Sequence, residues 1–79
     1  MNNLLLYSKP DCHLCEEMKI IVLKIRKEKN FNFQVININE DKLLYEKYRE
    51  KIPVLELNGR IIAKFRIDED KLKNCLLRN

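Results

Sequence analysis

Cys12 and Cys15 are the residues with the clearest capacity for chemistry, because only His13 and Leu14 separate them. Two thiols at this spacing can bind a metal ion, close a disulfide, or exchange electrons with another disulfide. A structural zinc site usually takes four ligands, whereas the remaining cysteine, Cys75, lies far along the chain. We therefore favour electron exchange, and we keep as the alternative a metal or iron–sulfur site completed by a second copy of the chain.

The cysteine pair is predicted to lie where a strand gives way to a helix. Residues 3–8 form a short apolar run, residues 9–11 (Lys-Pro-Asp) interrupt it, and a helix is expected to begin at Asp11 or Cys12. The unpaired amides and the dipole at a helix N-terminus favour a thiolate, with a pKa of roughly 3.5–7.5 in place of about 8.5. This position predicts that Cys12 attacks a disulfide and that Cys15, one turn on, resolves the mixed disulfide.

The rest of the chain predicts an α/β fold with the element order β-α-β-α-β-β-α. The first helix has an apolar face of Leu14, Met18, Ile21, Val22 and Ile25, and Asp68 is expected to cap a last helix with Leu72, Cys75 and Leu76 on one face. Strands are expected at 3–8, 31–38, 53–57 and 60–67, and a short helix at 40–51. Asn58-Gly59 predicts a hairpin between the last two strands. The elements would form a four-stranded mixed sheet flanked by helices, with the cysteines at the carboxyl end of the first strand.

Composition indicates one small domain spanning residues 1–79. Apolar residues are 46% and charged residues 35% of the 79 positions, which is ordinary for a packed globular chain. The longest apolar runs are far shorter than the roughly 18 residues of a membrane span, and nothing at the start reads as a signal peptide. We expect a cytoplasmic monomer without a membrane partner. The net charge of +4 gathers at one helix end, and we expect no nucleic-acid partner.

The motifs resemble those of a known family. The run Tyr7-Ser8-Lys9-Pro10-Asp11-Cys12-His13-Leu14-Cys15 is similar to the active-site turn of the glutaredoxins, and Ile52-Pro53-Val54-Leu55 is similar to their second landmark. The resemblance covers essentially the whole chain. It implies the thioredoxin/glutaredoxin-like fold, a cis bond before Pro53, and an enzyme that reduces or exchanges disulfides with the Cys12-Cys15 dithiol. The hypothesis from a different class is a non-catalytic thioredoxin-fold binding module, holding a partner or, as a dimer, a metal cluster.

Five further residues are candidates for substrate binding or for tuning the thiols. By resemblance Lys9 matches an active-site lysine, and its ammonium would lower the pKa of a nearby thiol. Tyr7 is expected to pack beside the cysteines, and His13 to tune the thiolate through its partial charge. The backbone of Ile52, turned toward the cysteines at Pro53, would pair with an extended substrate. Cys75 is expected to be a packing residue.

The expected partners are a protein carrying a disulfide and a reductant, either glutathione or a thioredoxin-reductase-like flavoprotein. No bound cofactor or metal is expected. The Gly-Gly with which the family holds glutathione is replaced here by Ala63-Lys64. Glycine lets a backbone approach a ligand closely because it has no Cβ, so we expect weak glutathione binding.

Overall fold

A four-stranded mixed sheet with three α-helices forms the protein, and the computed structural model describes residues 1–78. The elements, in chain order, are β1 (Asn3–Ser8), α1 (His13–Arg26), β2 (Asn32–Asn37), the 3₁₀ turn η1 (Ile38–Glu40), α2 (Lys42–Tyr48), β3 (Val54–Leu57), β4 (Arg60–Lys64) and α3 (Glu69–Leu77). The order predicted from the sequence is confirmed. Among these elements no helix is long and apolar enough to cross a membrane.

The strands lie in the order β2-β1-β3-β4, which makes β1 and β3 the two inner strands. β1 pairs in parallel with β2, with Leu4 opposite Phe33, and antiparallel with β3, with Leu4 opposite Leu57. A crossover through α1 joins the two parallel strands, as parallel pairing requires. β3 and β4 form the predicted hairpin. Asn58 and Gly59 both have positive φ, 51° and 86°, which a tight two-residue hairpin turn needs.

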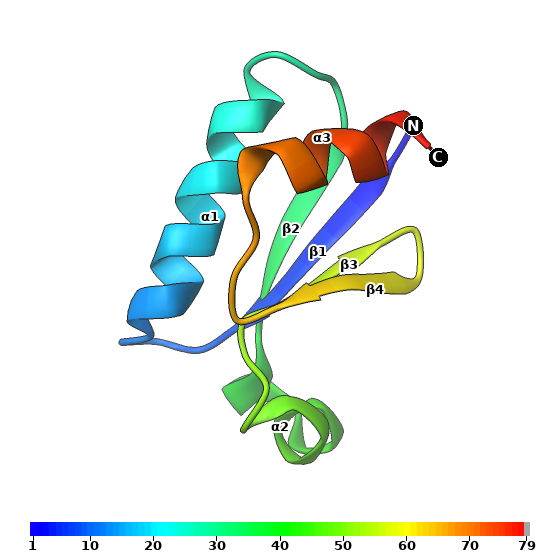
Figure 1. Ribbon diagram of the computed structural model, residues 1–79. Coiled ribbons are helices and arrows are strands. Elements are labelled where there is room, and N and C mark those ends of the chain that lie inside the picture. Colours follow the sequence, from blue (N-terminus) through cyan, green and yellow to red (C-terminus); the bar gives the residue numbers. More distant parts are fainter. Residues whose placement is uncertain (79) are drawn as a thin grey trace.

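The two faces of the sheet are covered differently. The main core lies on one face, under α1 and α3, which Figure 1 shows on the same side of the strands. Alternate residues of β1 and β3, such as Leu6 and Leu55, are fully buried there. α2 lies at one end of the sheet (Figure 1), where a smaller cluster joins Tyr48 of α2 to Tyr7 and Val54 on the other face. Residues far apart in sequence therefore meet at the end of the sheet where α1 begins.

Two predicted boundaries need correction, and side-chain caps explain one of them. The helix expected at 40–51 is shorter, since α2 spans only Lys42–Tyr48, and the separate turn η1 precedes it at Ile38–Glu40. Asn37 Oδ1 accepts a hydrogen bond from the Asn39 amide at 2.9 Å, while Asp41 Oδ1 accepts from the amides of Leu43 and Leu44 at 2.9 and 3.1 Å. Each cap starts its own helical segment because it satisfies amides that have no helical partner.

The last strand is also shorter than expected, since β4 ends at Lys64 and the prediction continued to 67. The next residue, Phe65, has φ 67°. A left-handed residue cannot continue an extended strand, so the chain turns away toward α3. Ile67 lies in the main core despite being outside the strand.

Asparagine side chains close the end of the sheet farthest from the cysteines. Asn58 Oδ1 accepts from the Asn3 amide at 2.8 Å, and Asn58 Nδ2 donates to Asn2 Oδ1 at 2.9 Å. Asn32 Nδ2 donates to Asn3 Oδ1 at 2.8 Å, and Asn2 Nδ2 donates to the Leu76 carbonyl at 3.3 Å. This asparagine network links β1, β2, the hairpin and α3.

Candidate active site

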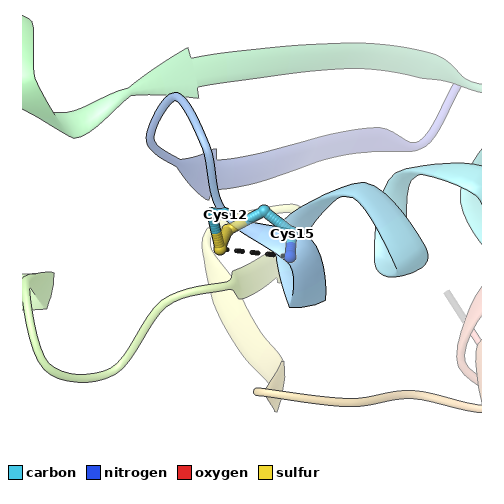
Figure 2. Close-up of a disulfide and its surroundings, with 2 residues drawn as sticks. All are labelled: Cys12 and Cys15. Carbon is cyan, nitrogen blue, oxygen red and sulfur yellow. Dashed lines mark hydrogen bonds between the residues drawn. A yellow bond between two sulfur atoms is a disulfide. The ribbon is translucent and has the colours of Figure 1, made fainter.

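Cys12 and Cys15 lie at the beginning of α1 and form a disulfide, with their Cα atoms 5.2 Å apart (Figure 2). The turn before them contains Asp11 with φ 59°. Aspartate tolerates this left-handed conformation better than most residues. The turn leaves Cys12 as the N-cap of α1 rather than as a residue within it.

The N-cap position gives the Cys12 sulfur a direct backbone donor. The Cys15 amide donates to Cys12 Sγ at 3.2 Å, the contact drawn as a dashed line in Figure 2. When the disulfide is reduced, the same amide and the positive end of the helix dipole would stabilise a thiolate on Cys12. Cys12 is partly exposed, whereas Cys15 is only 3% exposed. The geometry thus distinguishes an accessible sulfur from a buried one immediately behind it.

Tyr7, Cys15 and Ile52 share the smaller core cluster, and Cys12 packs against it. The structure therefore brings together most of the residues predicted from the two motifs. The Ile52–Pro53 peptide bond is cis, as the resemblance implied. The Pro53 carbonyl accepts a hydrogen bond from the Phe65 amide at 2.8 Å, which ties the loop before β3 to the residue after β4.

Lys9 and His13 lie at the surface, outside this cluster. The His13 side chain is 90% exposed, with Nε2 3.9 Å from Glu17 Oε1 one turn along α1. Lys9 is also exposed, in the turn between β1 and α1. Their roles in tuning the Cys12 thiol stay predictions. Cys75, by contrast, is partly buried and packs against the main core, where the sequence placed it.

Glu56 and Tyr48 belong to the surroundings of the site but were not predicted as part of it. The Tyr7 hydroxyl donates to Glu56 Oε1 at 3.4 Å, and the Tyr7 and Tyr48 rings have centroids 4.8 Å apart. Glu56 could have been singled out from the sequence, because it is a carboxylate in an otherwise apolar strand. For Tyr48 no signal separated this contact from ordinary helix packing.

Burial of the phenol raises the pKa of Tyr7 above its usual value, and the Glu56 carboxylate raises it further. In the unfolded chain this pKa returns to about 10. The contribution to stability is thus fully present below about pH 10, and it is lost as the pH rises through the folded-state pKa. Tyr7→Phe should therefore flatten the alkaline fall in the free energy of unfolding, as measured by urea denaturation across that range. The control, Tyr45→Phe at an exposed residue of α2, should keep the fall; an equal slope in Tyr7→Phe and the wild type would contradict this account.

Cys12 should be the first thiol of the reduced protein to be alkylated by iodoacetamide at mildly acidic pH. The reason is its exposure together with the amide that stabilises its thiolate. Peptide mapping by mass spectrometry after a short exposure measures the order of modification. Earlier labelling of Cys15 or Cys75 would reverse the assignment of the attacking sulfur.

Among residues 1–78 no group of three or more His, Cys, Asp or Glu side chains is placed to hold a metal ion. The mixed sheet, its helices and the disulfide at the beginning of α1 define a thioredoxin-like fold with a pair of cysteines at a helix N-terminus.

Comparison with known proteins identifies the family. The model of the Glutaredoxin-like domain (DUF836) matches residues 3–77, and the chain belongs to this family. A curated relative, the Glutaredoxin-like protein YDR286C homolog of Dictyostelium discoideum, is 33% identical over 76 residues, covering 89% of this chain and 70% of the relative.

Solved structures show the same fold. Protein Ne2328 from Nitrosomonas europaea superposes with a TM-score of 0.80 at 29% identity, covering 94% of this chain and 89% of that one. Protein XcR50 from X. campestris gives 0.79 at 28% identity, with 96% and 97% covered. A mutant thioredoxin from Halobacterium salinarum gives 0.73 at 20% identity, with 98% and 73% covered, which supports the fold alone.

Proposed function

We propose that the protein is a thiol–disulfide oxidoreductase that reduces disulfides in partner proteins. The Cys12 thiolate attacks one sulfur of the substrate disulfide, whose S–S bond breaks as a mixed disulfide forms, and the other substrate sulfur leaves as a thiolate that takes up a proton. Cys15 then loses its proton and attacks Cys12 Sγ. The second substrate thiol is released, and the two electrons of the dithiol have passed to the substrate, leaving the Cys12-Cys15 disulfide.

The observation that carries this proposal is the unequal environment of the two sulfurs. Cys12 is accessible and accepts a backbone hydrogen bond at 3.2 Å, whereas Cys15 is buried beside it. Attack requires an accessible thiolate. Resolution requires a second thiol that is shielded from external disulfides and close enough to attack Cys12. Cys15 meets this requirement, because it is buried and forms a disulfide with Cys12. The structure thus has the parts for two successive exchange steps.

The oxidised protein must regain two electrons from a separate reductant, and we propose a flavoprotein reductase using NADPH, in a reducing compartment such as the cytoplasm. The test follows insulin reduction with two recycling systems in parallel: glutathione with glutathione reductase, and thioredoxin reductase with NADPH. Faster turnover with the flavoprotein supports the proposal. If dithiothreitol-reduced protein transferred no electrons to insulin or to hydroxyethyl disulfide, the oxidoreductase function itself would be wrong.

Glutathione should bind weakly, with a dissociation constant above about 1 mM. The methyl group of Ala63 is buried in the main core, so the obstruction at the surface comes from the next two residues. Lys64 lies opposite Val54, and Phe65 follows it with an exposed ring. Side chains at both positions prevent the close backbone approach that glycine allows. A chemical-shift titration of the oxidised protein measures the affinity; saturation below about 1 mM at Lys9, Pro53 and Lys64 would contradict the expectation.

A further inference from the structure

β2 is an edge strand, since it lies at one end of the strand order and, within residues 1–78, pairs with β1 alone. The Asn32 amide donates to the Asn2 carbonyl at 2.8 Å, so the backbone groups of Asn32 point toward β1. Because these groups alternate in direction along a strand, those of Phe33 and Val35 point away from the sheet. Such a row of outward N–H and C=O groups can pair with a strand of another chain.

The other edge strand, β4, has features that discourage such pairing, whereas β2 lacks them. β4 begins at Arg60 and ends at Lys64, and charged residues on an edge oppose the approach of a second strand. Its pairing with β3 is also irregular, because Ile62 is an extra residue between the partners of Leu55 and Glu56. β2 instead has six residues in unbroken register with β1, and none of them is charged. Of the two edges, β2 is therefore the one open to another strand.

Apolar side chains lie exposed beside the same edge. Val35 pairs in register with Leu6, a main-core residue, so its side chain is on the face that α1 covers, yet it stays 40% exposed. Leu23 of α1 is exposed as well. It lies one turn before Arg26, whose Nε donates to the Phe31 carbonyl at 3.3 Å, so this side of α1 faces the beginning of β2. A strand added to β2 would reduce the exposure of both side chains.

The charges at the two ends of β2 have opposite signs. Lys27 and Lys29 lie just before the strand, and Glu40 and Asp41 lie just after it. Glu28, between the two lysines, is already paired with a lysine of α3 at 3.6 Å. The first residue of α2 is a lysine, which reduces the negative charge at the far end without cancelling it. In an antiparallel pair of β2 strands the positive end of each copy would lie beside the negative end of the other, whereas a parallel pair would bring like charges together.

We propose that two copies of the protein associate through antiparallel pairing of their β2 strands, related by a two-fold axis, into one continuous sheet. The axis would pass beside Gln34, which places Phe33 of each copy opposite Val35 of the other on the face that α1 covers. The neighbouring register, centred on Val35, would instead leave Phe33 opposite Asn37. The first register is favoured because aromatic and β-branched side chains stabilise each other across a pair of strands.

This dimer would place the two dithiols at opposite ends of the shared sheet. The cysteines follow the carboxyl end of β1, and β2 runs parallel to β1, so antiparallel pairing of β2 carries the second dithiol to the far end. Each dithiol would stay open to its own substrate, and no metal cluster could be held between them. The inference goes beyond the proposed function and does not depend on it. It also departs from the monomer expected from composition.

Sedimentation velocity of the oxidised protein over about 1 μM to 1 mM measures the association. We expect a dissociation constant on the order of 10 μM, because two paired edge strands bury a small interface. Val35→Lys gives β2 a charge like those of β4, and it should weaken association by about tenfold or more. Ile61→Lys is the matched control, since Ile61 is 41% exposed on β4, and it should associate like the wild type. Circular dichroism checks that both variants are folded.

Hydrogen exchange of the wild type at the two ends of this concentration range tests the same surface without a variant. The amides of Phe33 and Val35 should exchange about tenfold more slowly at the higher concentration, where most of the protein is dimeric, while the amides of β4 should be unchanged. A wild type that stays monomeric at about 1 mM would overturn the proposal and leave this edge to a strand of a different protein. A dimer that Ile61→Lys dissociates and Val35→Lys does not, or one that leaves exchange at Phe33 and Val35 unchanged, would also overturn it.

Discussion

Cys12→Ser protein is expected to show no disulfide reduction above background, whereas Cys15→Ser protein is expected to accumulate as a mixed disulfide with its substrate. The first change removes the nucleophile, and the Cys15 thiol is too deeply buried, at 3% exposure, to replace it. The second leaves attack intact but removes the thiol that resolves the intermediate. Replacing each of the two cysteines should therefore block a different step of the reaction.

Turnover of insulin and non-reducing mass spectrometry of the reaction mixture separate these outcomes. Cys75→Ser is the matched control, because Cys75 packs against the main core, outside the smaller cluster that contains Cys15. This variant should keep wild-type turnover. Full activity in both Cys12→Ser and Cys15→Ser would rule out a dithiol mechanism. A mixed disulfide trapped by Cys12→Ser would mean that Cys15 is the attacking thiol and Cys12 the resolving one.

Leu6→Ala should lower the free energy of unfolding by about 2–5 kcal/mol. Leu6 is fully buried in β1, one of the two inner strands, in the main core beneath α1 and α3. The truncation removes apolar contacts and leaves a cavity that a rigid sheet cannot readily close. Single domains are stable by only about 5–15 kcal/mol, so the loss is a large share of the total for a 79-residue chain.

Urea denaturation of the oxidised protein, followed by circular dichroism, measures this loss. Leu77→Ala, on the surface of α3 at 69% exposure, makes the same chemical change without a cavity and should stay within about 0.5 kcal/mol of the wild type. A similar small effect at Leu6 would mean that the main core does not depend on the packing described for β1.

The element order and the dithiol were predictable because both are local features of the sequence. The periodic apolar residues of α1, the Asn58-Gly59 turn and the pair of cysteines each depend on neighbours within a few positions. The end of β4 was missed for a different reason. Residues 65–67 alternate like a strand, and the left-handed turn at Phe65 has no glycine or asparagine to announce it.

The surroundings of the dithiol were predicted only in part, since they depend on contacts between distant segments. Tyr7 and Glu56 lie on strands that pair in the sheet, yet nothing near either residue in the sequence indicates the hydrogen bond between them. The cis bond before Pro53 was expected only through the family resemblance, because few proline bonds in folded proteins are cis. The groove between α1 and the segment that joins β4 to α3 likewise depends on two parts of the chain that are far apart in sequence.

The asparagine network also bears on where a label, tag or tether can be attached to this protein. Because Asn2 donates to the Leu76 carbonyl, the first and last segments of the described chain lie together, and Figure 1 shows them at the opposite end of the molecule from the beginning of α1. A fluorescent label, an affinity tag or a surface tether fused at either end would leave the dithiol facing away from the attachment. The nearness of the two ends also makes the chain a candidate for circular permutation by a short linker. Such a linker would close the ring at the end of the sheet opposite the dithiol.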